Sequence, residues 1–270
     1  MNVLSTEQKL AVLAAMVEGN SIRSTERMTG VHRDTIMRLV VQTGQNCERV
    51  LNQKMRGIRS RHVQVDEIWT YCGIKEKRLR QEHDPVAMGD QYVFVAMDAE
   101  TKLIPSFLVG KRNPANCYYF MQDLRERIVG RVQLTTDGFR PYLPAVEDAF
   151  GGNVDYAMLI KTYQDTGEQE KRYSPGQIVN AVPIPVTGDP QPFHISTSHI
   201  ERQNLTIRMQ LRRFTRLTNA FSKKLVNLKA ACALHFAWYN FCRVHSSLRV
   251  TPAMAAGIAS EVWGLESLLG

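Results

Sequence analysis

Apolar positions in the first forty residues recur at helical spacing. The first predicted helix carries one apolar stripe, formed by Leu10, Leu13, Ala14 and Val17. Ser5, followed three residues later by Gln8, is a capping-box pattern at its start, and Gly19 predicts its end. The same reasoning predicts a second short helix over 21–28 and a third over 32–42.

A tight turn that contains Gly30 separates the second predicted helix from the third. Helix, glycine-containing turn and helix together form the helix-turn-helix pattern, in which the last helix enters the major groove of DNA. The exposed side of the third helix would then present Arg33, Thr35 and Arg38 to DNA. A three-helix bundle with no role in DNA binding is the alternative that this pattern leaves open.

From His62 onward, the period of apolar positions changes from that of helices to that of strands. The segment HVQVDEIWTYC alternates and is rich in β-branched and aromatic residues. Further strands are predicted over 90–100, 102–112, 131–138 and 154–160. Helices are predicted over 113–129, over 141–150, from about residue 198, and over 219–245. This order predicts an α/β protein, a mixed sheet flanked by helices that is compatible with a ribonuclease H-like fold.

Pattern and composition divide the chain into parts. Residues 1–43 are predicted to form a small all-α helix-turn-helix domain, residues 44–61 a linker, and residues 62–270 the α/β domain. Residues 161–197 are polar and contain five prolines. They predict a Pro-rich irregular insertion that has room for a short hairpin.

The net charge of +8 is distributed unevenly along the chain. Residues 1–61 sum to +5 and residues 62–198 to −4, whereas residues 199–249 sum to +9 with ten basic residues and one acid. Two basic blocks on either side of a mildly acidic middle predict that a polyanion such as DNA is bound at two places. Solvated helical faces are the alternative explanation.

Cellular compartment follows from what the sequence lacks. No run of eighteen apolar residues occurs, and the first residues do not show the pattern of a signal peptide. The five cysteines are widely spaced, which does not predict a disulfide framework. We therefore expect a cytoplasmic, nucleoid-associated protein that does not contact a membrane.

Three acids stand out by their positions. Asp66 lies inside an otherwise apolar strand, Asp137 ends a later strand, and Glu201 is the single acid of the basic block 199–249. Neighbouring strands and a packed helix can bring such residues together, and three carboxylates can hold two Mg²⁺ ions for phosphoryl transfer, because hard cations prefer oxygen ligands. Singly, each acid also fits an ordinary role as a paired strand acid, a turn residue or a salt-bridge partner.

Residues near these acids have secondary roles in the prediction. Glu67 follows Asp66 and is expected on the opposite face of the sheet, in a salt bridge or a supporting position. Asp98 ends the second strand and is a reserve candidate for the acid site. Trp69, Trp238 and Tyr239 are able to stack on bases, but packing in the core is the favoured interpretation.

Four segments resemble transposases of the insertion-sequence-one (IS-one) family: VDEIWTYC, RVQLTTDGFRPYLPAVEDAFG, HISTSHIERQNLTIRMQLRRFTRLTNAFSKK and YNFCRVHSSLRVTPAMAAG. The resemblance extends from about residue 5 to about residue 260. It implies a DDE recombinase of ribonuclease H-like fold that uses two Mg²⁺ or Mn²⁺ ions, held by Asp66, Asp137 and Glu201. Unlike some members, this chain has no cysteine cluster before the predicted helix-turn-helix.

The resemblance also implies an activity and partners. A transposase of this kind binds the terminal inverted repeats of its insertion sequence, cleaves the 3′ ends and transfers them into target DNA, as a homodimer or a higher homo-oligomer. Basic residues after Glu201 are then expected on the DNA, with Arg208 beside the metals and phosphate contacts from Arg212, Arg213, Arg216, Lys223 and Lys224. A catalytically silent DNA-binding repressor and a ribonuclease H-like nuclease are the alternatives.

Overall fold

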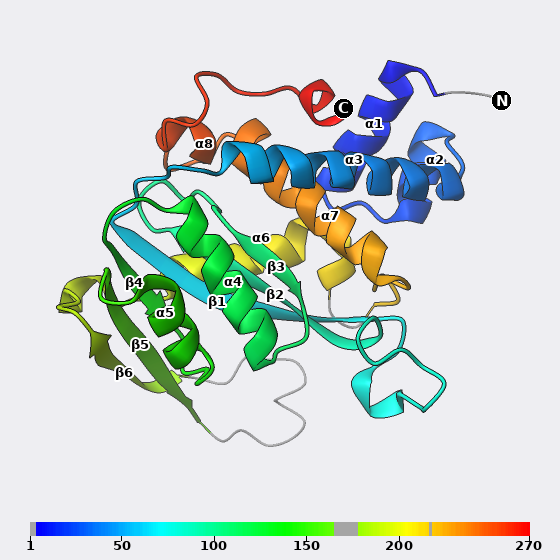
Figure 1. Ribbon diagram of the computed structural model, residues 1–270. Helices are drawn as coiled ribbons and strands as arrows, with labels where there is room; N and C mark the ends of the chain where they lie inside the picture. Colours follow the sequence, from blue (N-terminus) through cyan, green and yellow to red (C-terminus); the bar gives the residue numbers. More distant parts are fainter. Residues whose placement is uncertain (1–3, 165–177, 216–217) are drawn as a thin grey trace.

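The computed structural model describes residues 4–164, 178–215 and 218–270 (Figure 1). Its N-terminal part consists of helices α1 (Thr6–Val17), α2 (Ile22–Thr29) and α3 (Arg33–Lys54). The predicted capping box is confirmed, because the Ser5 hydroxyl accepts from the Gln8 amide and the Gln8 side chain accepts from the Ser5 amide. Gly30 ends α2 at a φ of 70°, in the left-handed region that glycine adopts readily.

Helix α3 is longer than the sequence predicts. It continues to Lys54, past the end expected near Gln42 and through most of the predicted linker. Gly44, Cys47 and Leu51 extend its buried face at helical spacing, so tertiary packing outweighs the tendency of a glycine to break a helix. The proposed domain boundaries stay a prediction, although this helix crosses the first of them.

The glycine within α3 has a packing reason. Helix α3 lies against α7 (Leu225–Ala237), as Figure 1 shows. A Cβ atom at Gly44 would lie 2.3 Å from the carbonyl oxygen of Ala230 on α7, closer than any real contact. The missing side chain therefore lets the two helices approach each other. Their buried residues join α1 and one face of the sheet in a single hydrophobic core.

The central sheet has six strands in the order β3-β2-β1-β4-β5-β6. They are β1 (His62–Cys72), β2 (Gly89–Asp98), β3 (Phe107–Gly110), β4 (Val132–Thr136), β5 (Val154–Tyr163) and β6 (Ile178–Thr187). The pairs β1–β4 and β4–β5 are parallel, whereas β1–β2, β2–β3 and β5–β6 are antiparallel. The predicted α/β class with a mixed sheet flanked by helices is thus confirmed, and this strand order resembles that of ribonuclease H-like folds.

Helices cover both faces of the sheet. On one face, α4 (Pro114–Arg127) and α5 (Tyr142–Phe150) share a core with Val63 and Val65 of β1. On the other face, α6 (Ser198–Gln210) and α7 belong to the core that contains Ile68. Successive residues of β1 therefore point to different helical layers, as strand alternation requires.

The predicted insertion is more regular than expected. Strand β5 extends to Tyr163, and β6 pairs with it antiparallel, so the described parts of residues 161–197 include a hairpin arm at the sheet edge. Pro183 and Pro185 lie in β6, where an edge strand tolerates residues without an amide hydrogen. The middle of the predicted insertion, residues 165–177, lies outside the described residues.

The C-terminal part packs back on the helical layer. Helix α7 begins at Leu225, later than the expected residue 219, and continues as a π-helix over Trp238–Cys242. Shorter elements are α8 (Pro252–Ala255) and the 3₁₀ turns Glu76–Arg78, Pro192–His194, Arg212–Phe214 and Leu265–Leu268. No helix in the described ranges combines the length and the apolar character that a membrane span requires.

The close approach of α3 to α7 predicts the effect of one substitution. In an open helix, glycine to alanine would stabilise by about 1 kcal/mol. Gly44→Ala should instead destabilise the fold by about 1–3 kcal/mol, because the new methyl group meets the backbone at Ala230. Urea denaturation measures the difference, with Gln45→Ala on the exposed side of α3 as the control. A more stable Gly44→Ala protein would contradict the packing described here.

Candidate active site

Asp66, Asp137 and Glu201 line one open cavity of about 710 Å³. Asp66 lies in the middle of β1, and Asp137 directly follows β4. Because β4 runs parallel to β1 and pairs with its residues 62–64, the end of β4 delivers Asp137 to the neighbourhood of Asp66. The sheet thus brings together two acids that are far apart in the sequence.

Gln64 determines where the third acid lies. This buried side chain of β1 accepts hydrogen bonds through Oε1 from the backbone amides of His199 (2.9 Å) and Ile200 (3.1 Å). These amides belong to the first turn of α6, where unpaired N–H groups need acceptors. The helix start is thereby held on β1, and Glu201 of the same turn faces the cavity.

Both carboxylate oxygens of Asp66 are engaged. Oδ1 accepts from the backbone amide of Glu67 at 2.9 Å, and Oδ2 accepts from Nδ2 of Asn204 at 2.8 Å. Asn204 follows Glu201 by three residues on α6, so it shares that side of the helix. Helix α6 therefore supplies one cavity acid and also orients another.

Arg112 connects the sheet acids on the side of α4. Its Nε lies 3.0 Å from Glu67 Oε2, and its Nη2 lies 3.3 Å from Asp137 Oδ2. The guanidinium also lies over the ring of Phe139, 3.8 Å from the centroid. The other oxygen of Asp137 accepts from the Phe139 amide at 3.0 Å. One cation thus offsets part of the negative charge of two carboxylates.

Glu201 has its own cation. Its Oε1 accepts from the Thr197 hydroxyl at 2.5 Å and from Nζ of Lys161. Lys161 lies on β5 and donates to the Thr197 hydroxyl as well, at 2.8 Å. The Glu201 carboxylate is consequently oriented from both β5 and the residue that precedes α6.

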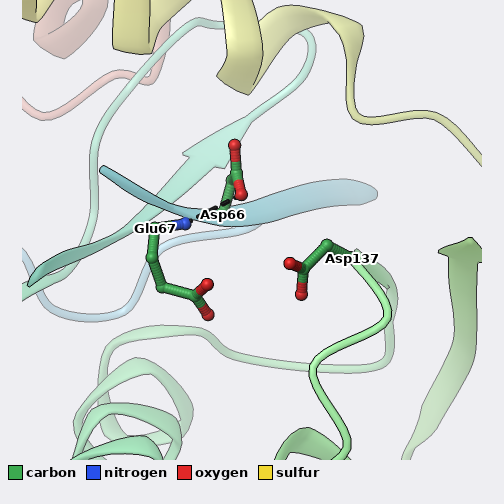
Figure 2. A group of neighbouring side chains, drawn as sticks. All are labelled: Asp66, Glu67 and Asp137. Atoms are coloured by element: carbon green, nitrogen blue, oxygen red, sulfur yellow. Dashed lines mark hydrogen bonds between the residues drawn. The ribbon is translucent and has the colours of Figure 1, made fainter. Parts of the chain in front are cut away.

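Glu67 is confirmed in the salt bridge that the sequence predicts. Figure 2 shows Asp66 and Glu67 leaving opposite sides of β1, with the carboxylates of Glu67 and Asp137 facing one another. The buried hydroxyl of Tyr142 donates to Glu67 Oε1. Even so, one carboxylate oxygen from each of Asp66, Glu67 and Asp137 lies within 4.8 Å of the others. Glu67 is thus closer to the acid site than a purely supporting position requires.

The electrostatics of these acids are unfavourable without a cation. Burial, followed by repulsion from Asp137 and Glu67, raises the pKa of Asp66 to about 7. Burial, followed by repulsion from Asp137, likewise raises the pKa of Glu67 to about 7. Burial also raises the pKa of Asp137. A group of oxygen ligands whose negative charges repel one another fits a hard divalent cation such as Mg²⁺ or Mn²⁺.

Comparison with known proteins gives likeness only at the level of structure. No protein-family model matches the chain, and no curated protein matches its sequence. One similar solved structure is a piggyBac transposase synaptic complex with hairpin DNA, at 11% identity and a TM-score of 0.38, covering 100% of this chain and 71% of that one. Another is the Mos1 strand transfer complex, at 15% identity and a TM-score of 0.24, covering 58% and 60%. A third is a Mos1 transposase paired-end complex with the left transposon end, at 11% identity and a TM-score of 0.26, covering 97% of this chain and 82% of that one.

The residues predicted to read DNA lie on the first turns of α3. Arg33 and Arg38 are exposed, and Thr35 is half-buried. The Arg38 guanidinium lies 3.4 Å from the Thr35 hydroxyl, so the two side chains occupy the same side of the helix. They are available at the surface, and their contact with DNA stays a prediction.

Two arginines after Glu201 lie elsewhere than expected. Arg208 is two turns further along α6, and its guanidinium donates to the Phe214 carbonyl at 3.3 Å; among described residues, the cations lining the acid cavity are instead Arg112, Arg140 and Lys161. Arg213 follows the end of α6 in a 3₁₀ turn and is buried, with its Nη1 donating to Ser222 at 2.9 Å. Helical spacing predicted that Arg208 shares a face of the helix with Glu201. It did not take account of the distance between them along the helix axis, nor did it predict that the helix ends at Gln210, before Arg213.

The other basic residues predicted to contact phosphates differ in what the structure describes of them. Arg212, Lys223 and Lys224 are exposed, which is compatible with phosphate contacts. Arg216 lies outside the described residues. The phosphate contacts of this group stay a prediction.

Asp98 does not belong to the acid site. The register pairs Asp98 with Val63, three residues before Asp66 along β1. Its buried Oδ1 accepts from the amides of Glu100 (2.7 Å) and Thr101 (2.9 Å), which makes it the cap of a turn. The turn between β2 and β3 therefore explains this acid without any role in catalysis.

Sequence reasoning missed Lys161 and Arg112. The sequence places Lys161 in an irregular insertion, because the apolar run of VDYAMLI ends just before it, whereas in the structure the strand continues through Lys161 to Tyr163. Arg112 follows β3, and its partners lie on β1 and after β4, so no local pattern marks it. Long-range ion pairs of this kind become visible only when the strands are assembled.

The burial of Asp66, together with repulsion from its neighbouring acids, predicts how stability depends on pH without metal. Because the folded-state pKa of Asp66 is raised to about 7, the folded protein holds a proton that the unfolded chain has already lost. The contribution of this proton to stability is therefore fully present below about pH 4 and is lost as the pH rises from about 4 to about 7. Asp66→Asn should flatten this fall and raise the melting temperature at pH 8 in EDTA, by about 2–4 °C for each kcal/mol relieved.

Calorimetric melting from pH 5 to pH 8 measures this effect. Asp148→Asn, which replaces an exposed acid on α5, is the matched control and should change the pH profile little. A lower melting temperature of Asp66→Asn at pH 8 would show that the carboxylate is a net stabilising group, contrary to the repulsion described here.

Proposed function

We propose that this protein is a DNA transposase that binds the terminal inverted repeats of an insertion sequence. It would cleave the 3′ ends and join them to target DNA in a reaction that depends on Mg²⁺ or Mn²⁺. One observation carries the proposal: Asp66, Asp137 and Glu201, taken from β1, the end of β4 and the start of α6, line a single open cavity. The IS-one resemblance of the surrounding segments selects the same three residues.

The three carboxylates would hold two divalent ions. When bound, such ions activate an attacking water or 3′-hydroxyl and offset the negative charge on the phosphate. The protein's own groups prepare this site. Asn204 and the Glu67 amide fix the two oxygens of Asp66, and Thr197 orients Glu201. These contacts reduce the reorganisation that the carboxylates need when substrate binds.

Arg112 and Lys161 have a second task in this proposal. Each already lies at the cavity, paired with a carboxylate. When cations take over the neutralisation of the acids, these two side chains become available to a DNA phosphate that approaches the same cavity. They would position the reacting strand, and water rather than a protein group would be the nucleophile for 3′-end cleavage, so no covalent protein–DNA intermediate forms.

DNA recognition is assigned to the N-terminal helices. The exposed side of α3 with Arg33, Thr35 and Arg38 would enter the major groove, and Arg212, Lys223 and Lys224 would contact phosphates. Two element ends must be held together before joining, which requires a homodimer or a larger assembly of this chain. We propose the nucleoid as the site of action, because the proposed substrate is DNA.

Removing one carboxylate charge tests the chemistry. Glu201→Gln keeps the shape of the side chain but removes the negative charge that faces Lys161 and the cavity. Cleavage and strand transfer should fall by about 10³-fold or more, whereas affinity for end DNA should change little. Adding Asp66→Asn should cost little further, because the members of one site act as a unit.

A gel assay with labelled end DNA in Mg²⁺ measures both steps, and a binding assay in EDTA measures affinity. Glu147→Gln on the exposed side of α5 is the matched control and should retain full activity. Normal joining by Glu201→Gln would refute the assignment of the acid site. Tight, selective binding of ends by a wild-type protein that never cleaves would instead indicate a repressor.

Substitutions on α3 test the recognition helix. Arg38→Ala should weaken selection of element ends over unrelated DNA by roughly 5- to 150-fold, the value of one good base contact. Arg49→Ala, on the same helix but beyond the predicted recognition turns, should leave that ratio unchanged. Competition binding at fixed salt gives the ratio. An unchanged ratio for Arg33→Ala and Arg38→Ala together would place recognition on another element.

A further inference from the structure

A second open cavity, of about 650 Å³, lies at the C-terminal end of β1. Its lining combines aromatic, basic and small polar side chains, among them Trp69, Tyr71, Lys75, Arg78, Arg213 and Phe221. The sequence predicted that Trp69, Trp238 and Tyr239 pack in the core. Trp238 and Tyr239 do so, but Trp69 is only half-buried and faces this cavity, so it requires another explanation.

Three aromatic rings form a row along this cavity. The ring of Trp69 lies 5.9 Å from that of Tyr71, and Tyr71 stacks on Phe221 at 4.3 Å with an angle of 30° between the planes. Phe221 reaches the strand because the next residue, Ser222, forms a bridge with Cys72 at the end of β1. All three rings are half-buried, which leaves ring surface for a planar ligand.

The cavity is strongly basic. Lys75, Arg78 and Arg213 belong to its lining, and the described residues that line it include no carboxylate. At its rim, Lys223 Nζ lies 3.1 Å from the centroid of the Phe221 ring, and Lys75 Nζ lies 5.9 Å from that of Tyr71. Cations beside aromatic faces are the combination that binds an anionic group attached to a planar ring.

The guanidinium of Arg213 is buried with only part of its hydrogen-bonding capacity used. About nine-tenths of this residue is buried, and one of its nitrogens donates to Ser222. Its Nε has no hydrogen-bond partner within the described part of the chain. Burying a charged donor without an acceptor is costly. The guanidinium nevertheless borders the cavity, so its positive charge acts on a ligand that binds there.

The two cavities share one open edge of β1. Strand β4 pairs with β1 only along residues 62–64, and within the described ranges no strand pairs with that edge again before the Cys72–Ser222 bridge. Asp66 faces the acid cavity on this stretch, and Trp69, three residues further on, leaves β1 on the opposite face, so one DNA strand would reach both cavities by crossing this open edge. At about 3.3 Å per residue, the two positions are roughly 10 Å apart, within reach of one DNA strand.

We infer that this aromatic cavity binds an unpaired nucleotide of the DNA strand that enters the acid site. Its base stacks on Trp69, while its phosphate and base oxygens meet Lys75, Arg78 and Arg213. The inference rests on the proposed function, because it takes the strand in the acid cavity to be DNA. Stacking needs no particular base, since every base has a flat face. The cavity therefore holds the strand out of its duplex without selecting a sequence.

The test uses two single-stranded oligonucleotides of equal length and charge, one carrying thymine bases and one made entirely of abasic sites. Binding to the full chain in EDTA is measured by fluorescence anisotropy. The base-containing strand should bind roughly 5- to 150-fold more tightly for each base that stacks. Trp69→Leu should reduce this ratio toward one, whereas Trp69→Phe, which keeps an aromatic face, should retain most of it.

Trp263→Leu is the matched control, because Trp263 is also half-buried and stacks on an aromatic ring, Phe241, but lies outside the cavity. It should keep the wild-type ratio, and circular dichroism reports whether each variant folds. Equal affinity of the wild-type protein for the two strands would reduce the cavity to a phosphate site and overturn the inference. An unchanged ratio in a folded Trp69→Leu protein would overturn it too.

Failure of the proposed function is distinguishable from these outcomes. The binding assay contains no divalent metal and needs no cleavage, so it does not depend on the acid site. If the protein never joins element ends but discriminates bases through Trp69, the proposed transposase function is refuted, whereas the nucleotide-binding role of the cavity is supported. If the protein joins ends normally but binds the base-containing and abasic strands equally, only the nucleotide-binding role of the cavity is refuted.

Discussion

The burial of neighbouring carboxylates at the junction of β1 and β4 is the constraint on which the rest of the site depends. Burial raises the pKa of Asp66, Glu67 and Asp137, and repulsion from neighbouring carboxylates raises the pKa of Asp66 and Glu67 further. Without a compensating cation, such a cluster lowers stability, and it persists because the surrounding sheet holds it in place. Arg112 on one side and Lys161 on the other offset part of the charge. The site is thus prepared for cations of higher charge.

The geometry of that junction depends on strand alternation and on one buried amide. Alternation along β1 sends Asp66 toward α6 and Glu67 toward α4 and α5, so adjacent acids have different partners. Gln64, two residues before Asp66, points to the same face and receives the first amides of α6. That contact holds the start of α6 on β1, and it thereby places Glu201 at the acid cavity. A single strand therefore aligns an acid, its neighbour and the helix that carries the third acid.

The helical layer extends this arrangement toward DNA. Close packing of α3 on α7 at Gly44 places the N-terminal helices in the same core as one face of the sheet. Under the proposed function, the helix that reads element ends and the sheet that cleaves them would then move together. The aromatic cavity at the end of β1 would add a third contact on the same strand of DNA, close to the reacting phosphate.

The sequence by itself determined the α/β class and the order of most elements, because strand alternation and capping patterns are local signals. It also proposed Asp66, Asp137 and Glu201 as the acid site, through motif resemblance, and their role stays a prediction. It also predicted that Arg33 and Arg38 lie on the exposed side of a helix. Only the tertiary structure decided the length of α3, the burial of Arg213, the cations Arg112 and Lys161 at the acids, and the exposure of Trp69. Each of these depends on which distant segment packs nearby, and that is a property of the assembled sheet rather than of any stretch of chain.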